Sequence, residues 1–136
     1  MLRPRRSAVA LLGAILAVAA LLAAGCSTAS VPLELTGDDN GSTQQLGVGQ
    51  ELRITLESNQ TTGYRWAIDG QLPPQLEQVG EPAYSSESKM VGAGGQEAWT
   101  FKGTRAGSGE LKLKYWRSFE PTAQPAETFA VTVKVN

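Results

Sequence analysis

The chain has 136 residues, enough for one packed domain but too few for a substrate-binding domain joined to a separate catalytic domain. It contains 12 Lys and Arg against 13 Asp and Glu without a basic run, which is a poor match to nucleic acid, whose phosphates require many cationic contacts. The absence of histidine excludes a His-based catalytic triad and a His metal ligand, and a single cysteine excludes an intrachain disulfide and a Cys-rich zinc site.

Residues 1–25 are organised like an export signal. A positive start is followed by an apolar run from residue 8 to residue 24, and the run leads to Cys26. The positive start consists of Arg3, Arg5 and Arg6. This arrangement resembles a bacterial lipoprotein signal, which implies cleavage before Cys26 and a diacylglycerol on its thiol. Ala23 stands where such signals usually carry Leu.

Two other interpretations of this segment stay open: an uncleaved membrane anchor, for which the apolar run is barely long enough, and a signal cut at a later small-residue site. The lipoprotein interpretation divides the chain into a signal peptide (1–25), a lipidated tether (26–30) and one domain (31–136). It places the protein in the cell envelope, anchored to a membrane through the lipid on Cys26. Ser27 indicates delivery to an outer membrane if the cell has one.

From Val31 onward, apolar residues alternate with polar ones between turn signals, which is the pattern of strands with one buried face. A turn at 38–41 is followed by a short continuation to Leu46, and 81–89 is a polar stretch without this alternation. The pattern predicts strands around 31–35, 52–56, 64–68, 76–79, 99–101, 111–115 and 129–135.

No segment after Gly25 shows a convincing helical period, so the domain is expected to be all-β. About seven short strands fit an immunoglobulin-like β-sandwich, with Trp66 as its central core residue. A closed barrel of similar strand number is the alternative fold.

Three connections hold residues that no turn requires. In 59–64, Gly63 can take a positive φ and two adjacent threonines stiffen the chain. The segment 92–95 is rich in glycine, so its backbone can approach another surface closely. The segment 115–121 carries aromatic and Arg side chains, which are typical of interface anchors. Each segment also has an ordinary explanation as a turn, a flexible run or a cap on the core. In a sandwich, however, all three would project from the same end.

At these segments the sequence resembles the chagasin family of cysteine peptidase inhibitors, from about Val31 to Val135. The family's three loop motifs correspond here to Asn59-Gln60-Thr61-Thr62-Gly63-Tyr64, Gly92-Ala93-Gly94-Gly95 and Arg117-Ser118-Phe119. Gln60 and Ser118 each replace a proline of the family pattern, which loosens loops whose stiffness should matter.

The resemblance implies an immunoglobulin-like domain that inhibits papain-like cysteine peptidases reversibly and without a covalent bond, as a monomer that needs no cofactor or metal. It implies a wedge of three loops in the active-site cleft, with Thr62 and Gly63 nearest the catalytic Cys and His of the peptidase. The other peptidase-binding positions that it implies are Asn59, Thr61, Tyr64, Gly92, Gly94, Gly95, Arg117 and Phe119. Gly94 and Gly95 would pair with an enzyme strand, and Arg117 and Phe119 would contact the primed side.

Two other classes of function compete with this one. A hydrolase would need a Ser–Lys type of site, and the sequence shows no recognisable arrangement of that kind. A noncatalytic envelope module of the same fold could bind another protein or a glycan, because a fold does not determine its function.

Overall fold

The structure is a computed structural model that describes residues 30–86, 92 and 94–136. The expected signal peptide, the lipidation site Cys26 and most of the tether lie outside the described residues, as does Ala93 of the glycine-rich run. In the part of the chain that is described, no helix has the length and apolar character needed to cross a membrane.

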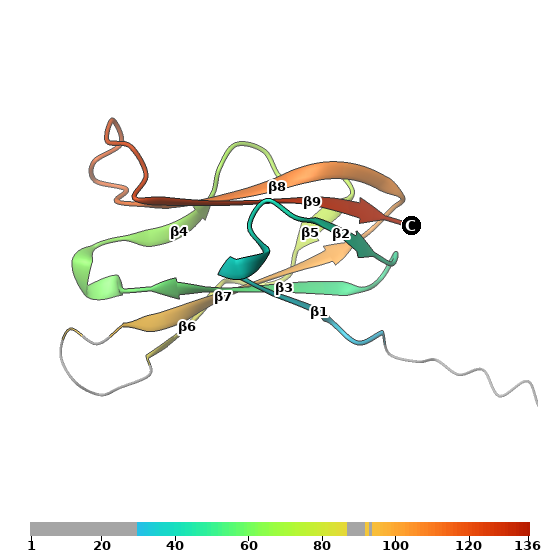
Figure 1. The fold of residues 1–136 in the computed structure, drawn as a ribbon, viewed down its shortest axis with the longest axis horizontal. Helices are drawn as coiled ribbons and strands as arrows, with labels where there is room; N and C mark the ends of the chain where they lie inside the picture. Colours follow the sequence, from blue (N-terminus) through green and yellow to red (C-terminus); the bar gives the residue numbers. More distant parts are fainter. Residues whose placement is uncertain (1–29, 87–91, 93) are drawn as a thin grey trace, which may run out of the picture.

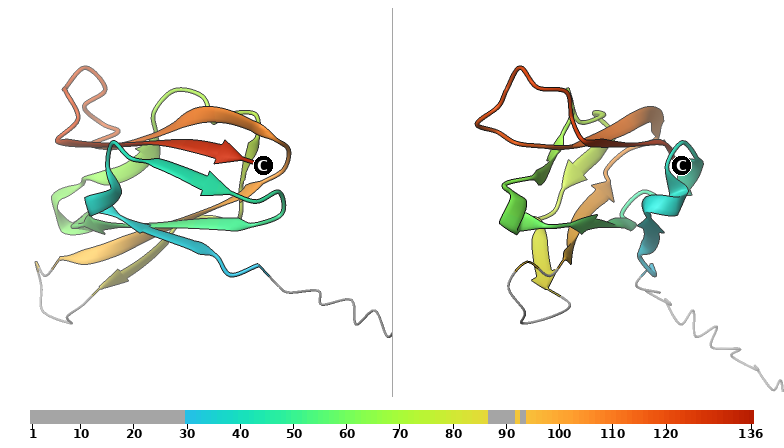
Figure 2. Two further views of the ribbon diagram at one scale, coloured as in Figure 1. Left: turned by 45° about the vertical axis from the view of Figure 1, so that its right-hand side comes forward. Right: turned by 60° about the vertical axis from the view of Figure 1, so that its left-hand side comes forward.

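The described residues form nine strands in two sheets that pack face to face (Figures 1 and 2). The five-stranded sheet contains β1 (Leu33–Thr36), β3 (Glu51–Ser58), β5 (Leu76–Gln78), β6 (Ala83–Ser86) and β7 (Gly95–Gly103). The four-stranded sheet contains β2 (Thr43–Leu46), β4 (Arg65–Ile68), β8 (Gly107–Trp116) and β9 (Glu127–Val135). The architecture is the expected all-β immunoglobulin-like sandwich rather than a closed barrel.

The predicted first strand and its continuation lie in different sheets. β1 runs parallel to β3, whereas β2 runs parallel to β9, and the short 3₁₀ helix η1 (Gly37–Asp39) joins them. Thr36 begins this crossover: its side chain accepts from the backbone N–H of Asp38, and its own N–H donates to Asp39 Oδ2 at 2.8 Å. Gly41, at φ 82°, ends it.

The strand β6 lies in the polar stretch for which the sequence predicted no strand. All four of its residues are exposed, so it lacks the apolar alternation that marks the other strands. It pairs with the first half of β7, and β5 pairs with the second half, so the two short strands share one edge of β7. Its backbone pairing with β7 places this edge strand in the sheet.

The core lies between the sheets and consists of alternate residues of the long strands. Phe101 and Phe129 are the largest fully buried side chains, and fully burying an apolar side chain of this kind stabilises a fold by about 1.5–3 kcal/mol. Trp66 belongs to this core, but at one end of it because β4 begins only at Arg65. Its indole N–H donates to the backbone oxygen of Glu57 at 2.9 Å.

Candidate functional site

Two connections project from the same end of the sandwich, on the left of Figure 1, and the strands that border a third connection, β6 and β7, meet at that end too. We name them loop A (59–64, between β3 and β4), loop B (87–94, between β6 and β7) and loop C (117–126, between β8 and β9). The strand ends that border them are in register within each sheet: Ser58 pairs with Gly95, which also pairs with Ser86, and Arg65 pairs with Trp116. The common end that the sequence predicted is therefore set by the strand pairing.

Loop A is a single turn of 3₁₀ helix, η2 (Gln60–Thr62), closed by Asn59 at its start. The side-chain oxygen of Asn59 accepts from the backbone N–H of Thr61 at 3.2 Å and from the Thr61 hydroxyl at 2.5 Å. The Thr62 hydroxyl donates to the Asn59 carbonyl at 2.7 Å. The hydroxyl protons of both threonines are thus used within the loop, and the exposed threonine side chains offer oxygen lone pairs and methyl groups to the surroundings.

Gly63 ends η2 in the left-handed conformation, at φ 80°, and the side chain of Phe119 lies directly against it. A Cβ atom at Gly63 would stand 3.0 Å from Phe119 Cε1 and 3.1 Å from Phe119 Cζ, closer than ordinary contacts. The position requires glycine both for its backbone angle and for the space that the ring takes.

Arg117 joins loop C to loop A. Its Nε–H donates to the carbonyl oxygen of Thr62 at 3.1 Å, and its guanidinium carbon lies 4.3 Å from the centre of the Tyr64 ring. A carboxylate oxygen of Glu120 lies 3.6 Å from the same guanidinium. A planar cation with several donors can make these contacts at once, so the two loops meet through one side chain.

Loop C begins with a tight turn in which the backbone N–H of Glu120 donates to the carbonyl of Arg117 at 3.0 Å. Ser118 and Phe119 occupy the two central positions of this turn. The Phe119 side chain is 67% exposed, so it does not cap the core. An aromatic ring held at the surface by its contact with Gly63 is free to contact a partner.

Tyr115 fixes loop A from beneath. The sequence placed this residue among the interface anchors of 115–121 and did not predict its contact with Asn59. The hydroxyl of Tyr115 accepts from the backbone N–H of Asn59 at 2.8 Å and donates to the Asn59 carbonyl at 3.3 Å. Its ring lies between those of Tyr64 and Trp66, with centroids 5.1 and 5.2 Å away. An aromatic residue at an inward position beside the third motif is the sequence signal that could have marked it.

The glycines of the second motif divide into two groups. Gly92, at φ 84°, and Gly94 are exposed, and no atom lies close to where their Cβ atoms would be. Gly95 is buried as the first residue of β7 and has paired strands on both sides. A Cβ there would overlap the backbone oxygen of Ser85 and lie 2.7 Å from the Tyr84 hydroxyl. The sheet itself thus requires a glycine at 95, whereas Gly94 leaves its backbone accessible.

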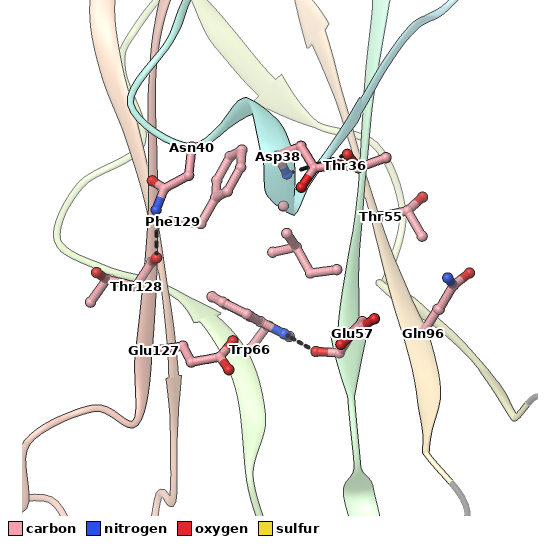
Figure 3. A pocket seen from close by; sticks show the side chains of 12 residues that line it. Thr36, Asp38, Asn40, Thr55, Glu57, Trp66, Gln96, Glu127, Thr128 and Phe129 are labelled. Carbon is pink, nitrogen blue, oxygen red and sulfur yellow. Dashed lines mark hydrogen bonds between the residues drawn. The ribbon is translucent and has the colours of Figure 1, made fainter.

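The tip of loop A is not enclosed by a cavity. A cavity of about 560 Å³ lies along the side of the sandwich, near η1 and Trp66, with Glu57 and Glu127 on its rim (Figure 3). A recess of about 350 Å³ lies at the base of loop A between Asn59 and Gly94. Thr61, Thr62 and Gly63 line neither space, so the tip projects from the surface instead of enclosing a ligand.

Comparison with known proteins identifies this arrangement. The family model of the chagasin family peptidase inhibitor I42 matches residues 45–133, which include all three loops. Chagasin from Trypanosoma cruzi is 31% identical over 107 residues, covering 76% of this chain and 97% of chagasin. Because the match takes in almost the whole of chagasin, the domain described here corresponds to a complete relative.

Solved structures share the fold. The cysteine protease inhibitor EhICP2 from Entamoeba histolytica superposes with a TM-score of 0.69 at 24% identity, over 77% of this chain and 96% of that one. PbICP-C, whose structure is a complex with falcipain-2, superposes with a TM-score of 0.54 at 25% identity, over 79% of this chain and all of that one. With a family model that matches most of the domain and a relative aligned along almost its full length, the chain belongs to the chagasin family of peptidase inhibitors.

Proposed function

We propose that loops A, B and C enter the active-site cleft of a papain-like cysteine peptidase and block it reversibly, without a covalent bond. As a member of an inhibitor family, the protein is not an enzyme. The main support for this way of binding is the contact between loops A and C, where Arg117 donates a hydrogen bond to Thr62 and Phe119 packs on Gly63. Loops held together before binding lose little conformational entropy in the complex.

The chemistry of loop A suits the catalytic pair of such a peptidase. A thiolate–imidazolium pair presents N–H donors, and the exposed oxygens of Thr61 and Thr62 can accept from them because their own protons are bonded inside the loop. Gly63 adds no side chain at the point of closest approach. Hydrogen bonds between these neutral hydroxyls and a charged donor are stronger than neutral pairs.

Loop A is also a poor substrate. The backbone N–H groups of Thr61, Thr62 and Gly63 all donate within the loop, and η2 is a helical turn instead of an extended strand. A peptide bond in this conformation is not placed for attack by the catalytic thiolate. The inhibitor should therefore remain uncleaved while it is bound.

The flanking loops contribute separate contacts. Gly92 and Gly94 allow the backbone of loop B to approach the enzyme, whereas Gly95 supports the loop from within the sheet. Phe119 offers an exposed ring for an apolar wall of the primed side, and Arg117 positions it. The complex of PbICP-C with falcipain-2 supports a papain-like peptidase as the class of partner.

The direct test is a titration of papain and cathepsin-like enzymes with residues 27–136, using a fluorogenic substrate. We expect one-to-one inhibition, recovery of enzyme activity on dilution and an intact inhibitor by mass spectrometry, with serine peptidases unaffected. Lack of inhibition of every papain-family enzyme at micromolar concentration would exclude this function and favour an envelope module that binds another partner.

We also propose that Cys26 carries a lipid and that the protein works from a membrane surface. The signal-like sequence of residues 1–25 supports this, and so does the geometry: Leu33 pairs with Leu52 at the start of β3, whereas loop A follows the end of β3 (Figure 1). The first strand thus begins at the end of the sandwich opposite the loops. An anchor on that side would hold the loops away from the membrane, where a peptidase can reach them.

A further inference from the structure

Glu97 is the one carboxylate among the buried polar residues of the described chain, at 4% exposure, and it belongs to none of the three motifs. It occupies an inward position of β7, two residues from both Gly95 and Trp99. None of the ion pairs among the described residues includes it. A buried carboxylate without a cation must be stabilised by hydrogen bonds, so its donors indicate what it does.

The two ends of loop A meet at a single oxygen of this carboxylate. Oε2 of Glu97 accepts from the hydroxyl of Ser58 at 3.2 Å and from the backbone N–H of Trp66 at 3.4 Å. Ser58 is the last residue of β3, and Trp66 is the second residue of β4. Because β3 and β4 belong to different sheets, no strand pairing joins these two ends.

The second oxygen has a different partner. Oε1 of Glu97 accepts from the indole N–H of Trp99 at 3.1 Å, and Trp99 lies on the same strand. One oxygen of the carboxylate thus accepts hydrogen bonds from the two ends of loop A, and the other accepts one from a core side chain. This division allows the two effects to be separated by mutation.

We infer that Glu97 is a positioning residue for inhibition: it holds the two ends of loop A at the spacing that the wedge requires, without touching the peptidase. The inference rests on the proposed function of loop A. Tyr115 fixes the first residue of the loop, whereas Glu97 joins its entry to its exit. Without that junction the 3₁₀ turn would keep its internal bonds, and the Trp66 indole would still donate to the Glu57 carbonyl, but Ser58 and the Trp66 backbone would no longer be held at one spacing.

The test compares three variants of residues 27–136, a region that contains the whole domain. Glu97→Met removes both acceptors at similar volume and should raise the inhibition constant for papain at least about tenfold. Glu97→Gln keeps one oxygen, which can still accept from both Ser58 and Trp66, and should stay within about threefold of the wild type. Trp99→Phe removes the donor to Oε1 and part of a buried core ring but neither contact to the ends of loop A, so it should lower the melting temperature and leave the inhibition constant unchanged.

Hydrogen exchange in the free inhibitor gives a readout that does not depend on the peptidase. The amides of Thr62 and Gly63 should exchange faster in Glu97→Met than in Glu97→Gln or Trp99→Phe, measured well below the melting temperature of each variant. If Glu97→Met does not fold, Ser58→Ala, which removes one of the two end contacts, takes its place with a smaller expected effect in the same direction.

The positioning role requires that the oxygen kept in Glu97→Gln preserves inhibition that Glu97→Met loses. If the two variants inhibit papain equally, whether both strongly or both weakly, the positioning role is wrong. If the wild-type protein inhibits no papain-family enzyme, the proposed function fails instead. In that case the amide exchange rates of Thr62 and Gly63, compared between Glu97→Met and the other variants, still show whether Glu97 orders loop A.

Discussion

Arg117 and Thr62 lie 55 positions apart in the chain, yet the guanidinium of one donates to the backbone oxygen of the other at 3.1 Å. The contact uses a carbonyl that η2 leaves unpaired at its end, and the same guanidinium covers the ring of Tyr64. Loops A and C therefore behave as one surface, and changes in either loop should affect the other.

Arg117→Lys tests this junction with the charge kept. An ammonium group cannot reproduce the planar Nε–H donor and the stacking on Tyr64 at the same time, so affinity for papain should fall about tenfold, or about 1.4 kcal/mol. Arg53→Lys is the matched control, since Arg53 pairs with Glu34 on the exposed face of the five-stranded sheet and surface ion pairs contribute little. Equal loss of affinity in both variants would show that overall surface chemistry, and not the junction, sets the affinity.

Gly63→Ala should separate the requirement for space from the requirement for a positive φ. Gly70 has nearly the same angle, 79° against 80°, but its Cβ would meet nothing within 4 Å, and it follows β4 at the other end of the sandwich. Both alanine variants should lose about 1 kcal/mol of folding stability in chemical denaturation. Only Gly63→Ala should also weaken inhibition, at least about tenfold, because its methyl group displaces Phe119.

Tyr115→Phe removes the hydroxyl that bonds to both backbone groups of Asn59 and keeps the ring between Tyr64 and Trp66. It should cost about 1–2 kcal/mol of unfolding free energy and increase exchange of the Thr61 amide. In Tyr64→Phe, the lost hydroxyl has no hydrogen bond to another described residue, so this variant should leave both quantities nearly unchanged. A stable, slowly exchanging Tyr115→Phe protein would mean that ring packing alone holds loop A.

Gln60→Pro and Ser118→Pro should strengthen inhibition. Gln60 is the first residue of η2, after Asn59 in an extended conformation, and Ser118 is the second residue of the Arg117–Glu120 turn; proline suits both positions. The expected gain is about 0.4–1 kcal/mol per substitution, seen as slower dissociation in surface plasmon resonance. Weaker binding by both variants, with circular dichroism unchanged, would contradict this backbone path for the two loops.

Cys26→Ser tests the proposed anchor. The wild-type protein should fractionate with membranes and show an acylated N-terminal Cys26 by mass spectrometry, while the variant should be misprocessed or released. Inhibition of papain by the released variant should match that of the anchored form, because the anchor joins the sandwich at the end opposite the loops. An unmodified thiol on a mature protein that still begins before Ala8 would refute lipidation.

Local pattern was sufficient to predict most of the fold. The alternation in β3, β7, β8 and β9 appears in the structure as buried residues on one face of each strand, because a strand that is half buried must alternate. The sequence missed β6, whose four residues are all exposed, and treated β2 as a continuation of β1. Alternation of apolar and polar residues cannot reveal a strand that has no buried face, and it cannot show which sheet a strand joins.

The three motifs, their order and the kind of domain that carries them follow from the sequence alone, since these depend on residue type and spacing along the chain. The atoms that join the loops are known only from the folded structure: Phe119 packs on Gly63, Gly95 lies within the sheet, and Glu97 connects Ser58 to Trp66. These contacts link residues from separate strands. They follow from how the two sheets pack, and no local pattern along the chain contains that information.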